Sequence, residues 1–461
     1  MEDKNIAMAH KLAEAVRSAG GQTYYVGGCV RDRLLGRDIK DIDIEVHGIP
    51  VQTLGQILDS LGERLELGAS YGVMGLRHYE LDIAMPRSET ATGRGHKDFA
   101  VCVDPFLGAE RAARRRDFTM NALMQDVLTG EILDFYGGRK DMERGLIRHV
   151  DDRSYGEDPL RALRAAQFAA RFGYTIAEET ISLSSGMDLT TLPGERVMGE
   201  MEKALFKAER PSIFFEALRK MRQLSVWFPE LEALIGLKQN PAFHPEGDVW
   251  THTMRVLDEA AKLRPAAKQP LWFVLSALCH DFGKAVTTEE IGGVLHAYEH
   301  EKKGLPLVQD FLHRMTRETK LCEYVLNMTE LHMKPNMLVG SGAKEKSYMK
   351  MFDRAVCPED LLLLAKADYL GCTGPCTDRE GWAEAYGKTG SRLREMLALY
   401  EERMSRPHLM GRDLIEAGIE PGPLFTEALA CAHKLHLAGR PKEEQLKAAL
   451  ALLGNGKHKE T

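Results

Sequence analysis

Closely spaced cysteine pairs are missing from this sequence, which has eight cysteines in 461 residues and no CxxC motif. The sequence therefore indicates neither a disulfide framework nor a cysteine-rich zinc site. The closest pair is Cys372 and Cys376, for which a zinc role is the less favoured interpretation. No apolar run approaches the roughly 20 residues that cross a bilayer, and the N-terminal segment lacks the apolar core of a secretory signal. We therefore expect a cytoplasmic protein without a membrane partner.

An excess of positive charge is absent as well, since 61 Lys and Arg face 68 Asp and Glu, for a net charge of -7. Taken alone, this balance argues against a nucleic-acid partner, because phosphate binding normally leaves a basic footprint. Between residues 111 and 171, however, Lys and Arg outnumber Asp and Glu. This distribution argues against indiscriminate RNA binding and favours a nucleic acid that is recognised by shape at one end.

The length suggests about three domains, and the pattern changes along the chain. Short β-rich runs at residues 23–26, 42–46, 72–76 and 80–84 alternate with glycine turns and helical stretches. After about residue 139 the strand signals fade, and residues 158–171, 196–208 and 212–223 have the spacing of amphipathic helices. We predict an α/β (α+β) domain followed by all-α domains, with joints near residues 238–248, 371–387 and 421–423.

The first group of chemically suggestive residues follows the first predicted strand, where the sequence reads GGCVRD at residues 27–32. Paired glycines let the backbone approach a phosphate, and Arg31 supplies fixed positive charge on the next turn. Asp41 and Asp43 are two apart in a strand context, so their carboxylates face the same side. Such a pair can hold one or two Mg²⁺ ions, and Asp82 is a candidate third ligand in its own short strand.

Two further segments add cations near these carboxylates. The arginines at residues 114–116 precede an apolar segment, and we interpret them as phosphate ligands. At residues 157–164 the sequence reads EDPLRALR, which places Asp158, Arg161 and Arg164 three apart on one helix face. An Asp and an Arg held in this way can pair with a base edge. The alternative is an internal salt bridge between them.

A second group of candidate ligands lies downstream and consists of histidines and acids on predicted helices. Its members are His244, Glu246, His252, His280, Asp281, His296, His300, His332 and Asp368. Imidazole and carboxylate together suit a transition metal or a mixed-metal hydrolytic site. A single histidine on a helix would more often be an ordinary core residue.

In order and spacing, the first group resembles the class II CCA-adding tRNA nucleotidyltransferase and poly(A) polymerase family. The resemblance implies a nucleotidyltransferase head (residues 1–140) and a helical neck and body (residues 141–238) for nucleotide selection and tRNA binding. It implies Asp41 and Asp43 as catalytic Mg²⁺ ligands. It also implies a set of nucleotide-binding residues, namely Gly28, Arg31, Arg116, Asp158, Arg161 and Arg164. Within this set, Asp158 and Arg161 match the pair that selects CTP or ATP.

One position departs from the family pattern, because Gln167 stands where many members carry a second arginine. A neutral amide can donate a hydrogen bond but cannot neutralise phosphate charge. The segment at residues 88–104 resembles in length the flexible loop that A-adding members keep and CC-only members shorten. A CC-only enzyme is therefore disfavoured.

The second group resembles the HD phosphohydrolase superfamily over residues 239–370. The resemblance implies His252, His280, Asp281 and Asp368 as ligands of a divalent transition metal, with His300 and His332 as candidate ligands of a second ion. It associates this domain with phosphatase and 2′,3′-cyclic phosphodiesterase activity. Residues 371–461 resemble a helical tail that contacts tRNA, for which a simple packing unit is the alternative.

Together these resemblances imply an enzyme that adds or repairs the 3′-terminal CCA of tRNA from CTP and ATP without a template. The RNA 3′-hydroxyl would attack the α-phosphorus in line while pyrophosphate leaves. Three alternatives stay open, namely an A-adding-only enzyme, a poly(A) polymerase, and an HD phosphohydrolase whose head only binds RNA. The polymerase is disfavoured because the chain has no long basic extension to hold generic RNA.

Overall fold

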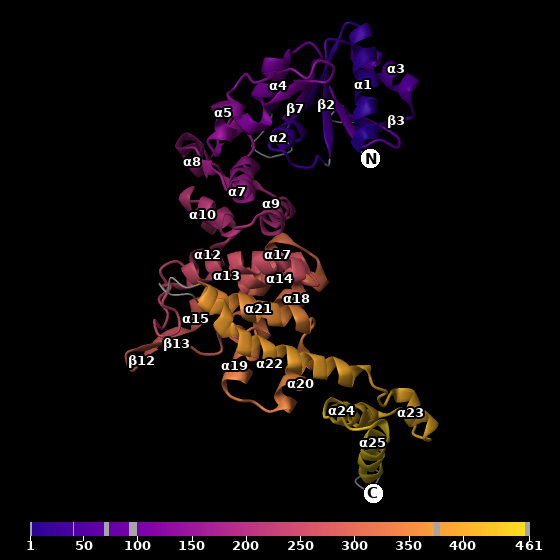
Figure 1. Cartoon of the computed structure of the whole chain (residues 1–461), viewed down its shortest axis with the longest axis vertical. Coiled ribbons are helices and arrows are strands. Elements are labelled where there is room, and N and C mark those ends of the chain that lie inside the picture. Colours follow the sequence, from indigo (N-terminus) through magenta and orange to yellow (C-terminus); the bar gives the residue numbers. More distant parts are fainter. Residues whose placement is uncertain (1, 40, 69–72, 92–98, 373–378, 457–461) are drawn as a thin grey trace. The chain divides into compact units, whose positions relative to one another are not determined.

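The computed structural model describes residues 2–39, 41–68, 73–91, 99–372 and 379–456, and the chain forms two compact units, Met1–Pro229 and Glu230–Thr461. Figure 1 shows that strands concentrate near the N-terminus and that helices dominate the rest of the chain. The predicted fold class, a mixed α/β head followed by helical domains, is confirmed. Within the described residues, no helix is both long and apolar enough to cross a membrane.

The first unit is built around a seven-stranded sheet in the order β3-β4-β5-β2-β1-β8-β9. Neighbouring strands are antiparallel, except that β2 and β5 run parallel. The strands of the sheet are β1 (Gln22–Val26), β2 (Ile42–His47), β3 (Arg64–Gly68), β4 (Val73–Leu76), β5 (Leu81–Ala84), β8 (Met124–Asp126) and β9 (Ile132–Leu133). Smaller pairings join β6 (Arg87–Ala91) to β7 (Phe99–Val103) and β10 (Leu146–Ile147) to β11 (Thr175–Ile176).

Helices cover the sheet and then continue alone through the rest of the first unit. They are α1 (Glu2–Ser18), α2 (Gly28–Leu34), α3 (Val51–Leu61), α4 (Ala109–Arg114), α5 (Gly138–Glu143), α6 (Asp152–Gly156), α7 (Leu160–Phe172), α8 (Glu178–Ser185), α9 (Gly194–Lys207), α10 (Ser212–Lys220) and α11 (Leu224–Trp227), with 3-10 turns η1 (Thr119–Asn121) and η2 (Leu189–Thr191). Helices α1 and α2 both contact β2. Because β2 is covered in this way, even Glu45 and His47 are buried in it.

The second unit packs α13, α14, α18 and α21 against one another around a core of large apolar side chains. Its helices are α13 (Val249–Leu263), α14 (Pro270–Cys279), α15 (Lys284–Thr287), α16 (His300–Lys303), α17 (Leu305–Met315), α18 (Thr319–Leu331), α19 (Lys334–Gly340), α20 (Glu345–Arg354), α21 (Pro358–Gly371), α22 (Arg379–Ser405), α23 (Gly411–Glu416), α24 (Pro423–Leu437) and α25 (Lys442–Gly456), with the 3-10 turn η3 (Arg264–Ala266). The short α12 (Pro229–Glu232) spans the division between the units. Helices α24 and α25 share a small core of their own, which includes Leu414 and Leu453.

The four strands that we predicted from the sequence are present. The other strands of the seven-stranded sheet were missed, because β8 and β9 are short and β3 has few apolar residues. A hairpin of β12 (Thr288–Ile291) and β13 (Val294–Ala297) also interrupts the predicted all-helical part. In the segment predicted as a flexible loop, β6 and β7 pair, and residues 92–98 lie outside the described residues. Cys376, named in the sequence analysis, also lies outside them.

The helix predicted to start at residue 158 begins at Leu160 instead. Asp158 Oδ1 accepts a hydrogen bond from the Leu160 backbone N–H at 3.1 Å, so the aspartate stands before the first turn. Short polar side chains often bond to nearby backbone N–H groups in this way and favour helix starts over helix interiors. Asp158 is therefore close to Arg161 in sequence without sharing its helix.

Candidate functional site

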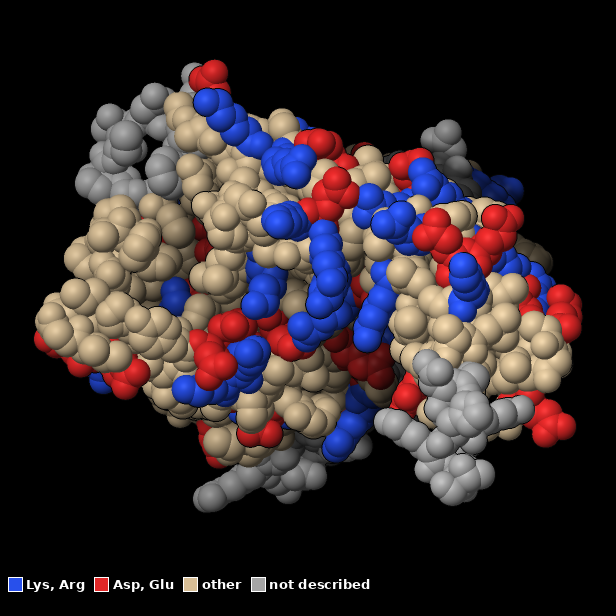
Figure 2. Space-filling view, turned by 90° about the horizontal axis from the view of Figure 1, so that it is seen from below, with Lys and Arg blue, Asp and Glu red and all other residues tan. Residues whose placement is uncertain are grey.

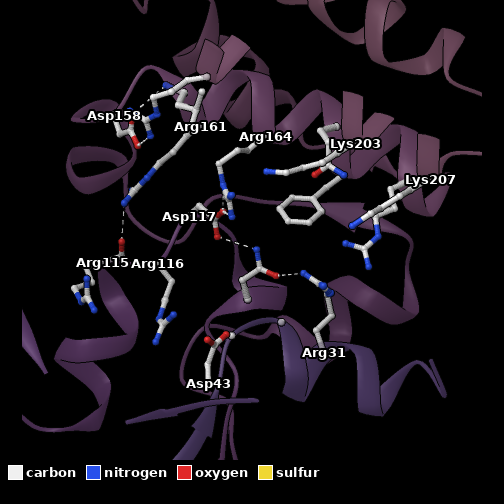
Figure 3. Close-up of a pocket in the computed structure, with 18 of the residues that line it drawn as sticks. Arg31, Asp43, Arg115, Arg116, Asp117, Asp158, Arg161, Arg164, Lys203 and Lys207 are labelled. Carbon is white, nitrogen blue, oxygen red and sulfur yellow. Dashed lines mark hydrogen bonds and ion pairs between the residues drawn. The ribbon is translucent and has the colours of Figure 1, made fainter. Parts of the chain in front are cut away.

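A cavity of about 520 Å³ opens between the sheet and the helices of the first unit (Figure 3). Its walls come from segments far apart in the sequence, which the fold brings together. The predicted residues that line it are Gly28, Arg31, Asp43, Arg116, Asp158, Arg161 and Arg164. Asp41 and Asp82 are not among the residues that line this cavity, but both act on the Asp43 carboxylate.

The carboxylates predicted to bind metal lie on adjacent strands. Asp43 on β2 stands directly opposite Asp82 on β5 in the parallel register, and Asp41 immediately precedes β2. Burial raises the pKa of Asp43, Arg116 lowers it, and Asp82 and Asp41 raise it again, so that the net shift is upward. Carboxylates that repel one another at a half-buried position fit a divalent cation, because its charge relieves the repulsion.

Gly27 holds the turn between β1 and α2 close to this charged group. Its backbone has a φ of 70°, which L side chains rarely adopt. A Cβ at Gly27 would lie 3.4 Å from Arg116 Nη1 and 3.6 Å from Asp43 Oδ2. The glycine therefore keeps the turn next to Asp43 and Arg116.

A chain of hydrogen bonds crosses the cavity from α2 to α7 (Figure 3). Arg31 Nη1 donates to Asn121 Oδ1 at 2.5 Å, and Asn121 Nδ2 donates to Asp117 Oδ1 at 2.9 Å. Arg164 Nε donates to the other oxygen of Asp117 at 2.8 Å, and Arg164 Nη2 forms an ion pair with that oxygen at 2.7 Å. Burial would raise the pKa of Asp117, but Arg164 and Asn121 lower it more. Asn121 and Asp117 thus fix the positions of two cations that face the cavity.

Glu45 has a similar function beside the metal-ligand candidates. It lies on β2 two residues after Asp43, and its Oε2 is 3.3 Å from Arg116 Nη2 and 3.9 Å from Arg115 Nη2. Burial opposes ionisation, but the hydrogen bond from His47 and the charge of Arg116 lower the pKa of Glu45 to about 2. Sequence reasoning missed Glu45, although Glu45 follows Asp43 by two residues, the same spacing that separates Asp43 from Asp41, which is a usable signal.

The arginines predicted as phosphate ligands do not all face the cavity. Arg115 and Arg116 line it, whereas Arg114 is exposed and pairs with Asp151 at 2.7 Å. Only the last two arginines of this run are therefore positioned to meet a ligand in the cavity.

Asp158 and Arg161 do not form the internal salt bridge that was the alternative interpretation. Arg161 donates to the backbone carbonyls of Ser154 and Arg115, at 2.7 and 2.8 Å. Asp158 Oδ2 is 3.7 Å from Arg196 Nη2. Both side chains line the cavity.

Gln167 lines the same cavity and is 2% exposed, and its Nε2 has no hydrogen-bond partner in the structure. Three basic residues that the sequence analysis missed complete this wall, namely Arg196, Lys203 and Lys207 on α9. Their spacings of seven and four residues along one helix are the signal that identifies a shared face. On the face of the molecule shown in Figure 2, Lys and Arg side chains lie among Asp and Glu side chains.

All six predicted ligands of the second unit come together in one buried cluster. His252 Nε2 lies 3.1 Å from Asp368 Oδ1 and 3.4 Å from His280 Nε2. On the other side of Asp281, His300 Nε2 lies 3.3 Å from the Asp281 Oδ1 atom and 3.3 Å from His332 Nε2. Three sets of groups could each hold an ion. Two consist of predicted ligands, namely His252, His280 and Asp368, and Asp281, His300 and His332. The third consists of His244, Glu246, His252 and Cys372.

The ring orientations in this cluster fit metal binding. The Nδ1 atoms of His280, His300 and His332 lie 2.7 to 2.9 Å from the backbone carbonyl three residues earlier. A carbonyl only accepts, so each Nδ1 carries the hydrogen and each Nε2 keeps a lone pair. All three Nε2 atoms point to the cluster, which is the arrangement of metal-binding histidines.

His252 is oriented by a side chain instead. Glu246 Oε1 lies 2.9 Å from the Nδ1 atoms of both His252 and His244, and the Glu246 side chain is fully buried. Burial opposes its ionisation, but the hydrogen bonds from the two histidines lower the pKa of Glu246 to about 2. Cys372 Sγ lies nearby, 3.7 Å from His244 Nδ1. His296, also named in the sequence analysis, lies on β13 outside these groups.

Comparison with known proteins follows the same two-part division. Residues 23–148 match the model of the poly A polymerase head domain, and residues 249–371 match that of the HD domain. A multifunctional CCA protein from Actinobacillus pleuropneumoniae serotype 5b is 36% identical over 369 residues, which cover 77% of this chain and 86% of the relative. The chain belongs to the multifunctional CCA protein family. A family member from Pasteurella multocida is 37% identical over 368 residues, which cover 76% of this chain and 84% of that protein.

Solved structures share the fold of this multifunctional CCA family member over nearly its whole length. The apo form II of a CCA-adding enzyme has a TM-score of 0.66 and 19% identity, covering 97% of this chain and 96% of that one. The Thermotoga maritima CCA-adding enzyme complexed with tRNA has a TM-score of 0.60 and 20% identity, covering 96% and 94% of the two chains. The resemblance inferred from the motifs is confirmed. Both matched families imply divalent metals, and the histidine–aspartate cluster is consistent with a metal site.

Proposed function

We propose that this protein adds or rebuilds the 3′-terminal CCA of tRNA, using CTP and ATP and no nucleic-acid template. The observation that carries the proposal is the first unit's cavity. It joins the Asp43 carboxylate, beside Asp82 and Asp41, to a wall of arginines held in place by Asp117, Asn121 and Glu45. Family membership gives the reaction, and the cavity gives each side chain a part in it.

The carboxylates at the sheet edge are proposed to hold Mg²⁺, with Asp41 and Asp43 as principal ligands and Asp82 as the third. When bound, the ion neutralises triphosphate charge and activates the RNA 3′-hydroxyl for in-line attack on the α-phosphorus. Gly28 lets the backbone approach the triphosphate, and Arg31, Arg116 and Arg164 bind its oxygens. Because these arginines are already fixed by hydrogen bonds, little reorganisation is needed when the nucleotide binds.

Base selection is assigned to Asp158 and Arg161. Arg161 uses two of its N–H groups on backbone carbonyls, which fixes the guanidinium plane and leaves further donors. Asp158 supplies acceptors on the same wall. A donor and an acceptor at fixed positions can discriminate the edges of cytosine and adenine as a template base would.

The whole chain is proposed to divide into the four parts that the sequence analysis expects. Residues 1–140 are the catalytic head, and residues 141–238 select the nucleotide and bind tRNA. Residues 239–370 are a metal-dependent phosphohydrolase, and residues 371–461 contact tRNA. The basic residues of α9 that line the cavity support an RNA path over the second of these segments.

The HD domain is proposed to hydrolyse phosphate esters, including 2′,3′-cyclic phosphates at damaged RNA ends. His252, His280, Asp281 and Asp368 would hold a divalent transition metal, with His300 and His332 completing a second site. When bound, such ions lower the pKa of a water molecule and polarise the phosphoryl oxygen. Replacing His280 with Ala should lower both the bound metal and cyclic-phosphate hydrolysis, and unchanged hydrolysis would contradict this assignment.

The transfer reaction is tested by pyrophosphate release. The protein is mixed with tRNA that lacks its 3′-CCA, with CTP, ATP and Mg²⁺, and pyrophosphate is measured over time. We expect release that depends on the tRNA and stops in Asp43→Asn. An HD phosphohydrolase with an RNA-binding head predicts no pyrophosphate from either protein.

A further inference from the structure

A second cavity, of about 620 Å³, lies beside the candidate metal cluster in the second unit. Asp281, His300 and Asp368 of the cluster form part of its wall. Most of the other side chains that line it are apolar or aromatic. A cavity with charged groups at the metal cluster and both apolar and polar side chains elsewhere has room for much more than a phosphate group.

Exposed aromatic rings line this cavity on segments far apart in the sequence. Phe243, in the segment before α13, is 72% exposed, and Tyr298, just after β13, is 58% exposed. The His296 ring stacks on the Tyr298 ring, with centroids 4.9 Å apart and planes 12° apart. Large aromatic side chains exposed together at one cavity indicate a binding surface.

The β12–β13 hairpin positions two of these rings. Its strands pair Thr288 with Ala297 and Glu289 with His296, and Figure 1 shows the hairpin projecting from the helices of the second unit. Thr288 on β12 and Leu295 and Ala297 on β13 also line the cavity. The hairpin thus contributes apolar and aromatic side chains to the wall of the cavity.

Polar groups suited to a phosphate lie in the same cavity. Gln239 is 9% exposed, and its Nε2 has no hydrogen-bond partner in the structure. Its Oε1 accepts from Lys284 Nζ at 2.9 Å, and Lys284 Nζ lies 2.7 Å from Asp281 Oδ2. An unpartnered amide N–H group and an ammonium group next to the cluster can both donate hydrogen bonds to phosphate oxygens.

We infer that this cavity binds the nucleoside of the phosphate ester, with the base against Phe243 and the stacked His296–Tyr298 pair. The phosphate then lies at the metal cluster, within reach of Gln239 Nε2 and Lys284. Stacking on aromatic rings accepts any base, because every base has a π-face. The cavity would therefore distinguish nucleotides from other phosphate esters rather than one base from another. This inference rests on the proposed hydrolytic function of the HD domain.

The test compares two substrates that carry the same reacting group. Hydrolysis of adenosine 2′,3′-cyclic phosphate and of the base-free glycerol 1,2-cyclic phosphate is measured with full-length protein. The double variant Phe243→Ala/Tyr298→Ala should raise KM for the adenosine compound on the order of 10-fold and leave KM for the glycerol compound unchanged. Val356→Ala, at an exposed residue outside the cavity, should match the wild type.

Equal effects of the double variant on both substrates, or no effect on either, would overturn the inference. Hydrolysis of neither substrate by the wild type would instead overturn the proposed hydrolytic function. Binding then decides the inference separately. Calorimetry with adenosine 2′-monophosphate and with inorganic phosphate should show that the double variant weakens binding of the nucleotide alone. Binding of the nucleotide in the head cavity adds the same signal to every protein compared. Unchanged nucleotide binding in the double variant would overturn the inference.

Discussion

Arg164 Nε donates a hydrogen bond to Asp117 Oδ2 at 2.8 Å, and Arg164 Nη2 forms an ion pair with the same oxygen at 2.7 Å, while Asp117 is buried at the wall of the first unit's cavity. The other oxygen of Asp117 accepts from Asn121, which in turn accepts from Arg31. One buried carboxylate thus positions two of the cations assigned to the triphosphate. Removing its charge should disturb both the stability of the head and its affinity for nucleotides.

We expect Asp117→Asn to lower the free energy of unfolding by about 2 kcal/mol or more, because Arg164 loses the counter-charge of a buried pair. The same variant should raise KM for CTP, since the guanidinium is no longer held at the cavity. Urea unfolding and initial rates measure the two effects. Arg114→Gln removes an exposed partner from the Arg114–Asp151 pair and should lower the free energy of unfolding less than Asp117→Asn does. Equal losses in the two variants would contradict the assigned role of Asp117.

Asp43→Asn should separate stability from catalysis. Because burial, and after it Asp82 and Asp41, raises the pKa of Asp43 against the lowering effect of Arg116, neutralising this side chain removes a net unfavourable charge from the metal-free protein. We expect Tm in EDTA to stay unchanged or rise, while nucleotide addition falls at least about 100-fold through loss of metal-borne charge stabilisation. A variant that unfolds in EDTA would show that Asp43 is chiefly a structural residue.

Glu45 predicts a specific dependence of stability on pH. Its pKa is lowered from an ordinary 4.5 to about 2 by His47 and Arg116, against the effect of burial. A lowered folded-state pKa stabilises the fold above the unfolded pKa, and this contribution is lost as pH falls toward 2. The difference in unfolding free energy between wild type and Glu45→Gln should therefore shrink as pH falls from about 4.5 toward 2. A difference that grows over this range would contradict the ion-pair account.

Glu246 is expected to control metal affinity in the second unit without touching the metal. It fixes the Nδ1 side of His252, so that Nε2 faces Asp368 and His280. Losing such a partner typically costs about 10- to 100-fold in metal affinity. We expect that loss for a divalent transition metal in Glu246→Gln, measured by competition with a chelator. Glu323→Gln, at an exposed position on α18, is the control and should bind metal as the wild type does.

The sequence could predict the residues whose chemical role follows from their type and from their spacing to nearby residues in the chain. The Asp41–Asp43 pair, the arginine of the first motif and the HD ligands all belong to this class, and the structure brings the ligands of the second unit together. Glu45 and Asn121 were not predicted as positioning residues because their roles depend on partners 71 and 90 residues away. Long-range partners of this kind are set by the packing of the sheet against α2 and η1, which no local pattern encodes.

The β12–β13 hairpin was missed for a different reason. Its strands are four residues each and largely exposed, so they have no buried apolar face to produce an alternating pattern. The helix start at Leu160 was placed two residues early, because the Asp-Pro pair suits either a cap or a first turn until the hydrogen bond of Asp158 is known.

The central claim is tested most directly by the lengths of the products made from defined tRNA ends. Full-length protein is incubated with tRNAs that end before the first C, after the second C, or in complete CCA, with CTP, ATP or both, and the products are sized on a denaturing gel. We predict two added nucleotides with CTP alone on the first substrate, one with ATP alone on the second, and none on the third. Extension of the complete tRNA by many residues of A, or no extension of any substrate, would contradict the account.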